Sequence, residues 1–134
     1  MLENAKVATR LPAQDLERAK AFYAEKLGLQ PAEQRPGGAL YRVANGEFGL
    51  FESAGAPSGA HTQMGFEVED IEATVAELRR RGVVFEEYDF PGLAKVEGIT
   101  EIVGNYPSKG SGERAVWFRD SEGNLIGIGQ SVGG

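Results

Sequence analysis

VATRLPAQDLERAKAFYAEKLGL at residues 7–29 has a counterpart in TQMGFEVEDIEATVAELRRRGV at residues 62–83. Each stretch begins with a short extended segment, continues with Asp and an aliphatic residue, and runs through a helical pattern that ends at Gly. Asp15 and Asp70 hold the same place in the two copies, at an offset of 55 residues. The offset predicts a chain built from two similar modules.

The first copy predicts one amphipathic helix, from Leu16 to Lys26. Asp15 is a favourable N-cap, because its carboxylate can accept hydrogen bonds from the free amides of the first turn. Gly28 supplies the left-handed position that ends many helices. Apolar residues at helical spacing predict a buried face made of Leu16, Ala19, Phe22, Tyr23 and Leu27.

Strands are expected on both sides of this helix. Residues 6–11 form the first strand, and Pro12 is expected to end its ladder because proline has no amide hydrogen. Asn45-Gly46 is a strong signal for a hairpin turn. The other strands of the first half are expected at residues 29–34, 39–43 and 47–53.

The second half repeats this order. Asp70 caps a helix whose expected buried positions are Ile71, Thr74, Val75 and Leu78, and Gly82 ends it. Asp120-Ser121-Glu122-Gly123 has the composition of a hairpin turn. The expected strands lie at residues 63–68, 83–89, 99–103, 114–119 and 124–130.

The predicted fold class is α+β. Two tandem βαβββ modules, at about residues 5–53 and 61–131, are expected to form a curved, partly open mixed β-sheet cleft with the helices packed outside. Residues 54–60 are small and uncharged and are expected to link the modules within a single domain, 1–134. The alternative is an ordinary α+β sandwich whose halves resemble each other by chance.

Composition narrows the classes of function. The formal net charge is −6 and the sequence pI is near 4.9, so the average surface repels nucleic acids and anionic membranes. The chain has no Cys, which removes thiolate catalysis and thiolate metal ligands. The chain has no stretch of about 20 apolar residues, which is the length that spans a membrane, and residues 1–6 have no apolar signal-peptide core. A cytoplasmic protein is the default expectation.

Three motifs resemble one family. DLERAKAFYAEKLGL at 15–29, GFEVEDI at 65–71 and WFRDSEGNLI at 117–126 are similar to segments of the vicinal oxygen chelate superfamily. That superfamily includes glyoxalase I, extradiol dioxygenases and bleomycin resistance proteins. The resemblance covers nearly the whole chain and is specific for the fold, whereas one fold can carry many functions.

The resemblance also implies where a metal would bind. Members that hold a divalent ion use His or Glu at four strand positions, which correspond here to Ala8, Gly49, Gln63 and Gly127. Three of these residues have no donor side chain and the fourth is a neutral amide, whereas divalent metals need several imidazole or carboxylate ligands. We therefore expect no metal and no cofactor.

Small and aromatic residues are expected in the cleft instead. Strand alternation carries Arg10, Phe51 and His61 to the same faces as the four ligand positions. The long segment 88–112 is expected to line or cover the ligand. The candidate ligand-binding residues are Arg10, Phe51, His61, Gln63, Tyr88, Tyr106 and Trp117.

Several of these residues have an alternative explanation. Arg10 could form a salt bridge with one of the many acids, and His61 could be a solvated loop residue. Gly49 and Gly127 lie at equivalent module positions, where glycine either leaves room for a ligand or allows strands to pack tightly. The sequence alone leaves these alternatives open.

The function we expect is metal-independent binding of a small organic molecule by a homodimer. The resemblance to bleomycin resistance proteins makes sequestration of an antibiotic or metabolite the concrete version. One alternative is a glyoxalase-like lyase, isomerase or dioxygenase with a relocated metal, or one that uses Arg10 and His61 alone. Another is a dimeric sensing or interaction domain.

Overall fold

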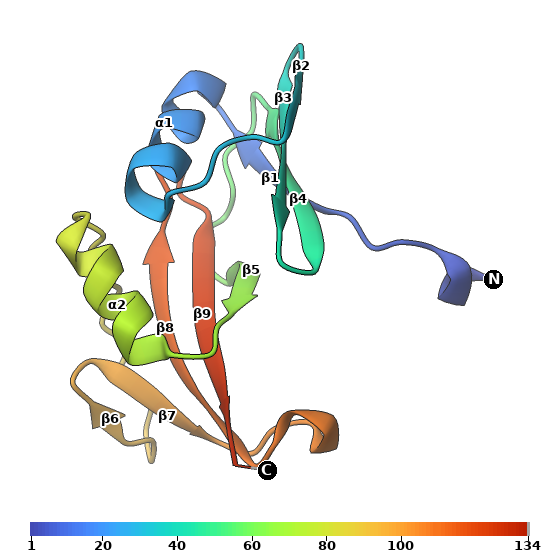
Figure 1. The fold of residues 1–134 in the computed structure, drawn as a ribbon. Coiled ribbons are helices and arrows are strands. Elements are labelled where there is room, and N and C mark those ends of the chain that lie inside the picture. Colours follow the sequence, from blue (N-terminus) through green and yellow to red (C-terminus); the bar gives the residue numbers. More distant parts are fainter. Residues whose placement is uncertain (134) are drawn as a thin grey trace. The chain divides into compact units, whose positions relative to one another are not determined.

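The computed structural model describes residues 1–133 and divides into two compact units. Unit 1 comprises residues 1–58 together with 120–124, and unit 2 comprises residues 59–119 and the chain from Leu125 onward. Each unit has one α-helix and one open mixed sheet (Figure 1). Among the described residues, no helix is long and apolar enough to cross a membrane.

The sheet of unit 1 has the strand order β1-β4-β3-β2. β1 runs parallel to β4, and the other two pairings are antiparallel. The elements in chain order are the 3-10 helix η1 (Leu2–Asn4), β1 (Thr9–Ala13), α1 (Leu16–Leu27), β2 (Glu33–Arg35), β3 (Gly38–Val43) and β4 (Gly46–Glu52).

The sheet of unit 2 follows the same plan with one more strand at its edge. Its order is β5-β9-β8-β7-β6, with β5 parallel to β9 and the remaining pairs antiparallel. The elements are β5 (Thr62–Glu67), α2 (Ile71–Arg80), β6 (Lys95–Val96), β7 (Ile99–Val103), the 3-10 helix η2 (Pro107–Lys109), β8 (Gly112–Arg119) and β9 (Leu125–Val132).

Strand register confirms the predicted repeat. Arg10 of β1 pairs with Gly49 of β4, and Gly65 of β5, 55 residues after Arg10, pairs with Gly127 of β9. The helix starts agree as well, because the carboxylates of Asp15 and Asp70 each accept a 3.0 Å hydrogen bond from the amide three residues later. The two-module α+β fold is thus present.

Helix α1 buries an aromatic cluster against its own sheet. The ring of Tyr23 lies 5.6 Å from that of Tyr41 and 5.8 Å from that of Phe48, and these last two rings stack at 4.9 Å. Within the predicted apolar face only Ala19 and Tyr23 are fully buried, while Leu16, Phe22 and Leu27 are partly exposed. Gly28 ends the helix with φ of 69°, as predicted.

Two strand predictions are wrong. Pro12 was expected to end the first strand, yet it lies inside β1, opposite Phe51. β1 is an edge strand paired only with β4, so a residue without an amide hydrogen is tolerated there. Residues 83–89 form no strand. They contribute a single bridge between Phe85 and Phe118, and the sheet position is taken by β7 instead.

The turn between β8 and β9 belongs to unit 1. Buried Asp120 accepts hydrogen bonds from the Tyr23 hydroxyl at 2.8 Å and from the amides of Glu122 and Asn124. The side-chain amide of Asn124, which has no exposed surface, donates to the carbonyl of Pro12 at 3.0 Å. These bonds fix α1 and β1 through a turn more than 90 residues away in sequence.

Candidate functional site

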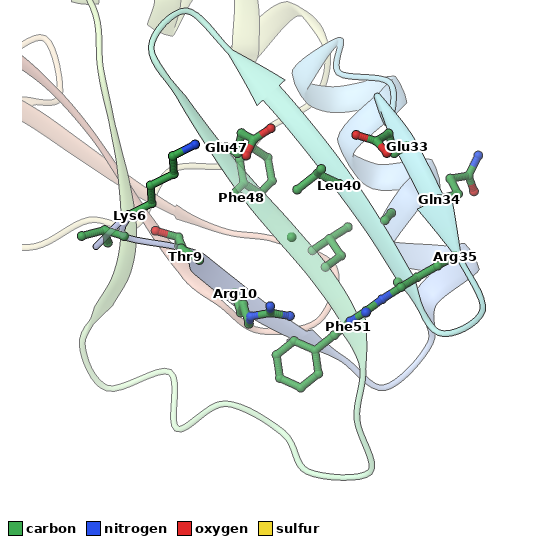
Figure 2. Close-up of a pocket in the computed structure, with 16 residues that line it drawn as sticks. Lys6, Thr9, Arg10, Glu33, Gln34, Arg35, Leu40, Glu47, Phe48 and Phe51 are labelled. Carbon is green, nitrogen blue, oxygen red and sulfur yellow. The ribbon is translucent and has the colours of Figure 1, made fainter. Parts of the chain in front are cut away.

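A pocket of about 350 Å³ lies on the face of the unit 1 sheet that α1 does not cover. Strand alternation separates the two faces, since Leu11 and Ala13 of β1 are buried in the core while Arg10, Gly49 and Phe51 line the pocket. Figure 2 shows these side chains on β1 and β4 with those of β2 and β3 beside them. The volume is within the range of small-molecule sites.

The register of the sheet orders the pocket into two rows. In the first row Arg10 is paired with Gly49, which is paired with Leu40, which is paired with Glu33. In the second row Phe51 is paired with Gly38, which is paired with Arg35. The second row therefore has an aromatic ring at one end, a guanidinium at the other end and a glycine between them.

The carboxylates of the pocket are already bound. Arg42 donates to Glu47 at 2.6 Å through its Nε and also forms an ion pair with Glu33. Hydrogen bonds to Glu47 and then Glu33 raise the pKa of the Arg42 guanidinium. One cation is therefore shared by the two acids and offsets one of their two negative charges.

The remaining cations of the pocket have no such partner. Within residues 1–133, the side chains of Lys6, Arg10 and Arg35 form no ion pair with a carboxylate. The alternative explanation for Arg10, a salt bridge to an acid, is therefore not what the described residues show. The pocket carries uncompensated positive charge.

A second pocket, of about 370 Å³, lies on the corresponding face of the unit 2 sheet. Its floor includes Gly65, Gly127 and Gly129, and Trp117 of β8 stands beside them. The Trp117 ring lies 5.6 Å from that of Tyr88 and 5.5 Å from that of Phe90. Tyr88 and Phe90, at the start of the segment 88–112, thus form an aromatic cluster with Trp117 within unit 2.

The glycines at equivalent positions differ in how crowded they are. A Cβ at Gly49 would meet nothing nearer than the Ala39 carbonyl oxygen at 3.7 Å, an ordinary contact. A Cβ at Gly127 would lie 3.3 Å from the methyl group of Thr62 and 3.5 Å from the Trp117 ring. Packing therefore does not require glycine at position 49, and its absent side chain leaves room in the pocket.

The residues present do not fit a metal ion. Ala8 and Gly49 line the first pocket and Gly127 lines the second, while Gln63 lies at a bulge of β5 and lines neither. Nowhere in residues 1–133 do three or more His, Asp or Glu side chains gather closely enough to hold a metal. One amide among three aliphatic or absent side chains cannot replace the imidazole and carboxylate ligands that divalent ions need.

The other predicted site residues are dispersed. Arg10 and Phe51 line the pocket of unit 1, and Trp117 lines that of unit 2. His61 is exposed just before β5, and Tyr106 is 76% exposed before η2. Neither of them lines the two pockets.

Sequence reasoning missed Arg35. The expected strand ended at Gln34, one residue short, so the side chain was left in a loop. Pro36-Gly37 forms a two-residue turn that places Arg35 opposite Gly38, and Gly37 has a positive φ of 75°, as the second central position of a type II turn requires. Recognition of Pro-Gly as a hairpin turn would have brought Arg35 beside Phe51.

Comparisons with known proteins agree with this architecture. The family model described as Glyoxalase/Bleomycin resistance protein/Dioxygenase superfamily matches residues 7–128. A search of curated proteins found no match. Among solved structures, a glyoxalase/bleomycin resistance protein/dioxygenase from Nocardioides is 22% identical with a TM-score of 0.64, over 96% of this chain and 83% of its own.

Two further structures are similar in fold. TnmS3, an antibiotic binding protein from Streptomyces sp. CB03234, is 23% identical with a TM-score of 0.62, over 93% of each chain. Lactoylglutathione lyase from Agrobacterium tumefaciens is 20% identical with a TM-score of 0.62, over 95% of this chain and 93% of its own. A binding protein and an enzyme are thus equally similar, and the likeness shows the fold alone.

Proposed function

This chain belongs to the Glyoxalase/Bleomycin resistance protein/Dioxygenase superfamily, and on that premise we propose that it is a metal-independent small-molecule-binding protein. Its ligand is an antibiotic or a metabolite that the protein sequesters without chemical change. The site is the pocket of unit 1, and the corresponding pocket of unit 2 combines Trp117 with the acidic side chains of Glu67 and Glu113.

One observation carries the proposal. At Gly49, where the family's pattern expects a carboxylate, the chain has an uncrowded glycine that opens onto a pocket of about 350 Å³. A site that lacks the metal-binding carboxylate but keeps an open pocket favours binding of an organic molecule over metal-assisted chemistry.

The lining of the pocket supports a binding role. Phe51 and Leu40 offer an aromatic ring and an aliphatic side chain next to the flat surface at Gly49. Apolar side chains with a few polar groups are typical of small-molecule sites. The likeness to TnmS3, itself described as an antibiotic binding protein, makes an antibiotic the more concrete ligand.

The proposal includes association into a homodimer, as the resemblance to bleomycin resistance proteins implies. Light scattering coupled to size-exclusion chromatography measures the mass in solution. A mass of about one chain, 14.4 kDa, at every protein concentration would remove the homodimer from the proposal while leaving ligand binding untouched.

A thermal-shift screen of aromatic antibiotics and metabolites tests the binding role. A ligand at 100 times its dissociation constant stabilises the folded state by about 2.7 kcal/mol, which a melting curve detects. We expect hits with the wild type that are lost in Gly49→Val, whose side chain fills the pocket. Gly46→Ala, in the nearby hairpin outside the pocket, is the control and keeps them.

Two results would overturn the proposal. One is a screen with no hit that depends on Gly49. The other is elemental analysis showing a stoichiometric, tightly held divalent ion in the purified protein, together with turnover of a hit compound.

A further inference from the structure

We propose that the ligand of the unit 1 pocket is a planar aromatic carboxylate whose anionic group binds between Arg10 and Arg35 and whose ring lies on Phe51. This inference rests on the proposed function and adds the chemical class of the ligand.

The distribution of charge in the pocket selects an anion. Glu33 and Glu47 both pair with Arg42, so part of their negative charge is already offset within the protein. Arg10 and Arg35 form no ion pair with a carboxylate of residues 1–133 and line the same pocket, Arg10 from β1 and Arg35 from β2. A carboxylate entering there gains two charged donors without displacing an existing partner.

The geometry of the two arginines fits one shared group. Figure 2 shows their side chains pointing toward each other, with Phe51 at the same end of the pocket. Arg35 lies over Gly38, where an added Cβ would be 3.1 Å from its Nε, so glycine is what lets this guanidinium lie close to the sheet. A guanidinium presents two parallel N–H donors that match the two oxygens of a carboxylate.

The surface between the arginines fits an aromatic ring. Phe51 and Gly38 are paired across β4 and β3, and Gly49 lies two residues from Phe51 on the same face. Because Gly49 has no side chain, the surface beside the Phe51 ring is flat there, and a second ring can stack against Phe51. A phosphate or sulfate without a ring would forgo this contact, so a ring-bearing carboxylate is the better match.

Three probes that share the naphthalene ring and differ in the charge of the attached group test the inference. They are 2-naphthoate, its neutral isostere 2-naphthamide, and the cation 2-naphthylmethylammonium, titrated calorimetrically into the full chain. We expect 2-naphthoate to bind about tenfold more tightly than 2-naphthamide, as one or two charge-assisted hydrogen bonds provide. The cation binds most weakly. Salt near 1 M, where the Debye length is about 3 Å, reduces the preference for the anion.

Variants then locate the selectivity. Arg10→Gln and Arg35→Gln each lower the affinity for 2-naphthoate about fivefold to tenfold and leave the affinity for 2-naphthamide unchanged, which also shows that they are folded. Arg80→Gln makes the same change of charge on α2 of unit 2 and leaves both affinities at the wild-type value.

The outcomes separate this inference from the proposed function. Equal binding of 2-naphthoate and 2-naphthamide, or anion selectivity that survives in both Arg10→Gln and Arg35→Gln, overturns the inference while the pocket remains a binding site. Failure of all three probes, alongside Gly49-dependent hits in the thermal-shift screen, has the same meaning. The absence of any Gly49-dependent ligand removes the proposed function as well.

Discussion

The hydroxyl of Tyr23 donates a 2.8 Å hydrogen bond to the carboxylate of Asp120, 97 residues along the chain. Tyr23 is fully buried and Asp120 is 5% exposed, so water does not compete with the bond. Burial, followed by the charge of Asp120 and the hydrogen bond to it, raises the pKa of Tyr23, which keeps the proton on the donor. The bond connects α1 to the β8–β9 turn within unit 1.

Replacing Tyr23 by Phe is expected to lower the free energy of unfolding by about 1–3 kcal/mol, because the buried Asp120 carboxylate loses a donor that nothing replaces. Urea denaturation measures the change. Tyr106→Phe, at a residue that is 76% exposed, serves as the control and should leave the midpoint unaltered. Equal stability of both variants would show that the bond contributes nothing.

Acid should destabilise the protein through Glu122. The hydrogen bond from Arg18, helped by the amide of Asp15 and the hydroxyl of Ser121 and opposed by burial, lowers the pKa of this carboxyl from 4.5 to about 2. A carboxyl whose pKa is lower in the folded state stabilises it above its unfolded pKa, and this contribution is lost as the pH falls. We expect the loss between about pH 4.5 and pH 2.

Stability curves measured at a series of pH values check this expectation. Glu122→Gln is less stable than the wild type near neutral pH, because Arg18 loses its carboxylate partner, and its stability falls less steeply in acid. The exposed residue Glu69 provides the control, since Glu69→Gln should follow the wild-type curve. Parallel curves for Glu122→Gln and the wild type would contradict the role of the pair.

Substitution by alanine should affect stability differently at two strand glycines. Gly49→Ala is expected to leave stability unchanged within about 0.5 kcal/mol, since its Cβ would make only an ordinary contact. Gly112→Ala is expected to cost about 1–3 kcal/mol, because its Cβ would lie 2.8 Å from the Ile102 carbonyl oxygen in the neighbouring strand. Thermal melts decide the matter, and a large loss in Gly49→Ala would mean that packing, not a ligand, requires that glycine.

Removal of divalent ions should have no effect on ligand binding. The four family positions hold Ala8, Gly49, Gln63 and Gly127, which supply at most one neutral donor. Dialysis against EDTA is therefore expected to leave both the melting temperature and the affinity for any hit of the screen at their starting values. A drop in affinity that added Zn²⁺, Mn²⁺ or Ni²⁺ restores would contradict metal-independent binding.

The sequence predicted the module order because the signals for it are local. Asp15, Asp70 and Gly28 act within one helical turn, so both helices were placed correctly. The β3–β4 hairpin is also present, but its turn is Ala44-Asn45, one residue before the expected Asn45-Gly46, and Gly46 pairs with Val43 in the sheet. Pro12 was misjudged because its tolerance depends on β1 being an edge strand, which is a property of the whole sheet.

Non-local features were the ones that escaped prediction. Residues 83–89 have the apolar pattern of a strand, yet Val83 is buried alone and Phe85 contributes only one bridge. Arg35 lines the pocket because it pairs with Gly38 across a short hairpin, whereas the expected strand ended at residue 34 and left Arg35 out. The bonds between Glu122 and α1 join positions about 100 residues apart, and no periodicity in a single sequence reports such a pair.

The turn at residues 120–124 has a consequence for how the protein can be divided. A fragment that stops at Ser58 has the whole of α1 and the sheet of unit 1 but lacks the acceptor for the Tyr23 hydroxyl and the carboxylate that binds Arg18. We therefore expect a fragment of residues 1–58 to be less stable than the same residues in the full chain. If the chain were divided at the linker, the first half would lack Asp120 and Glu122, and the partners of Tyr23 and Arg18 would be encoded in the second half.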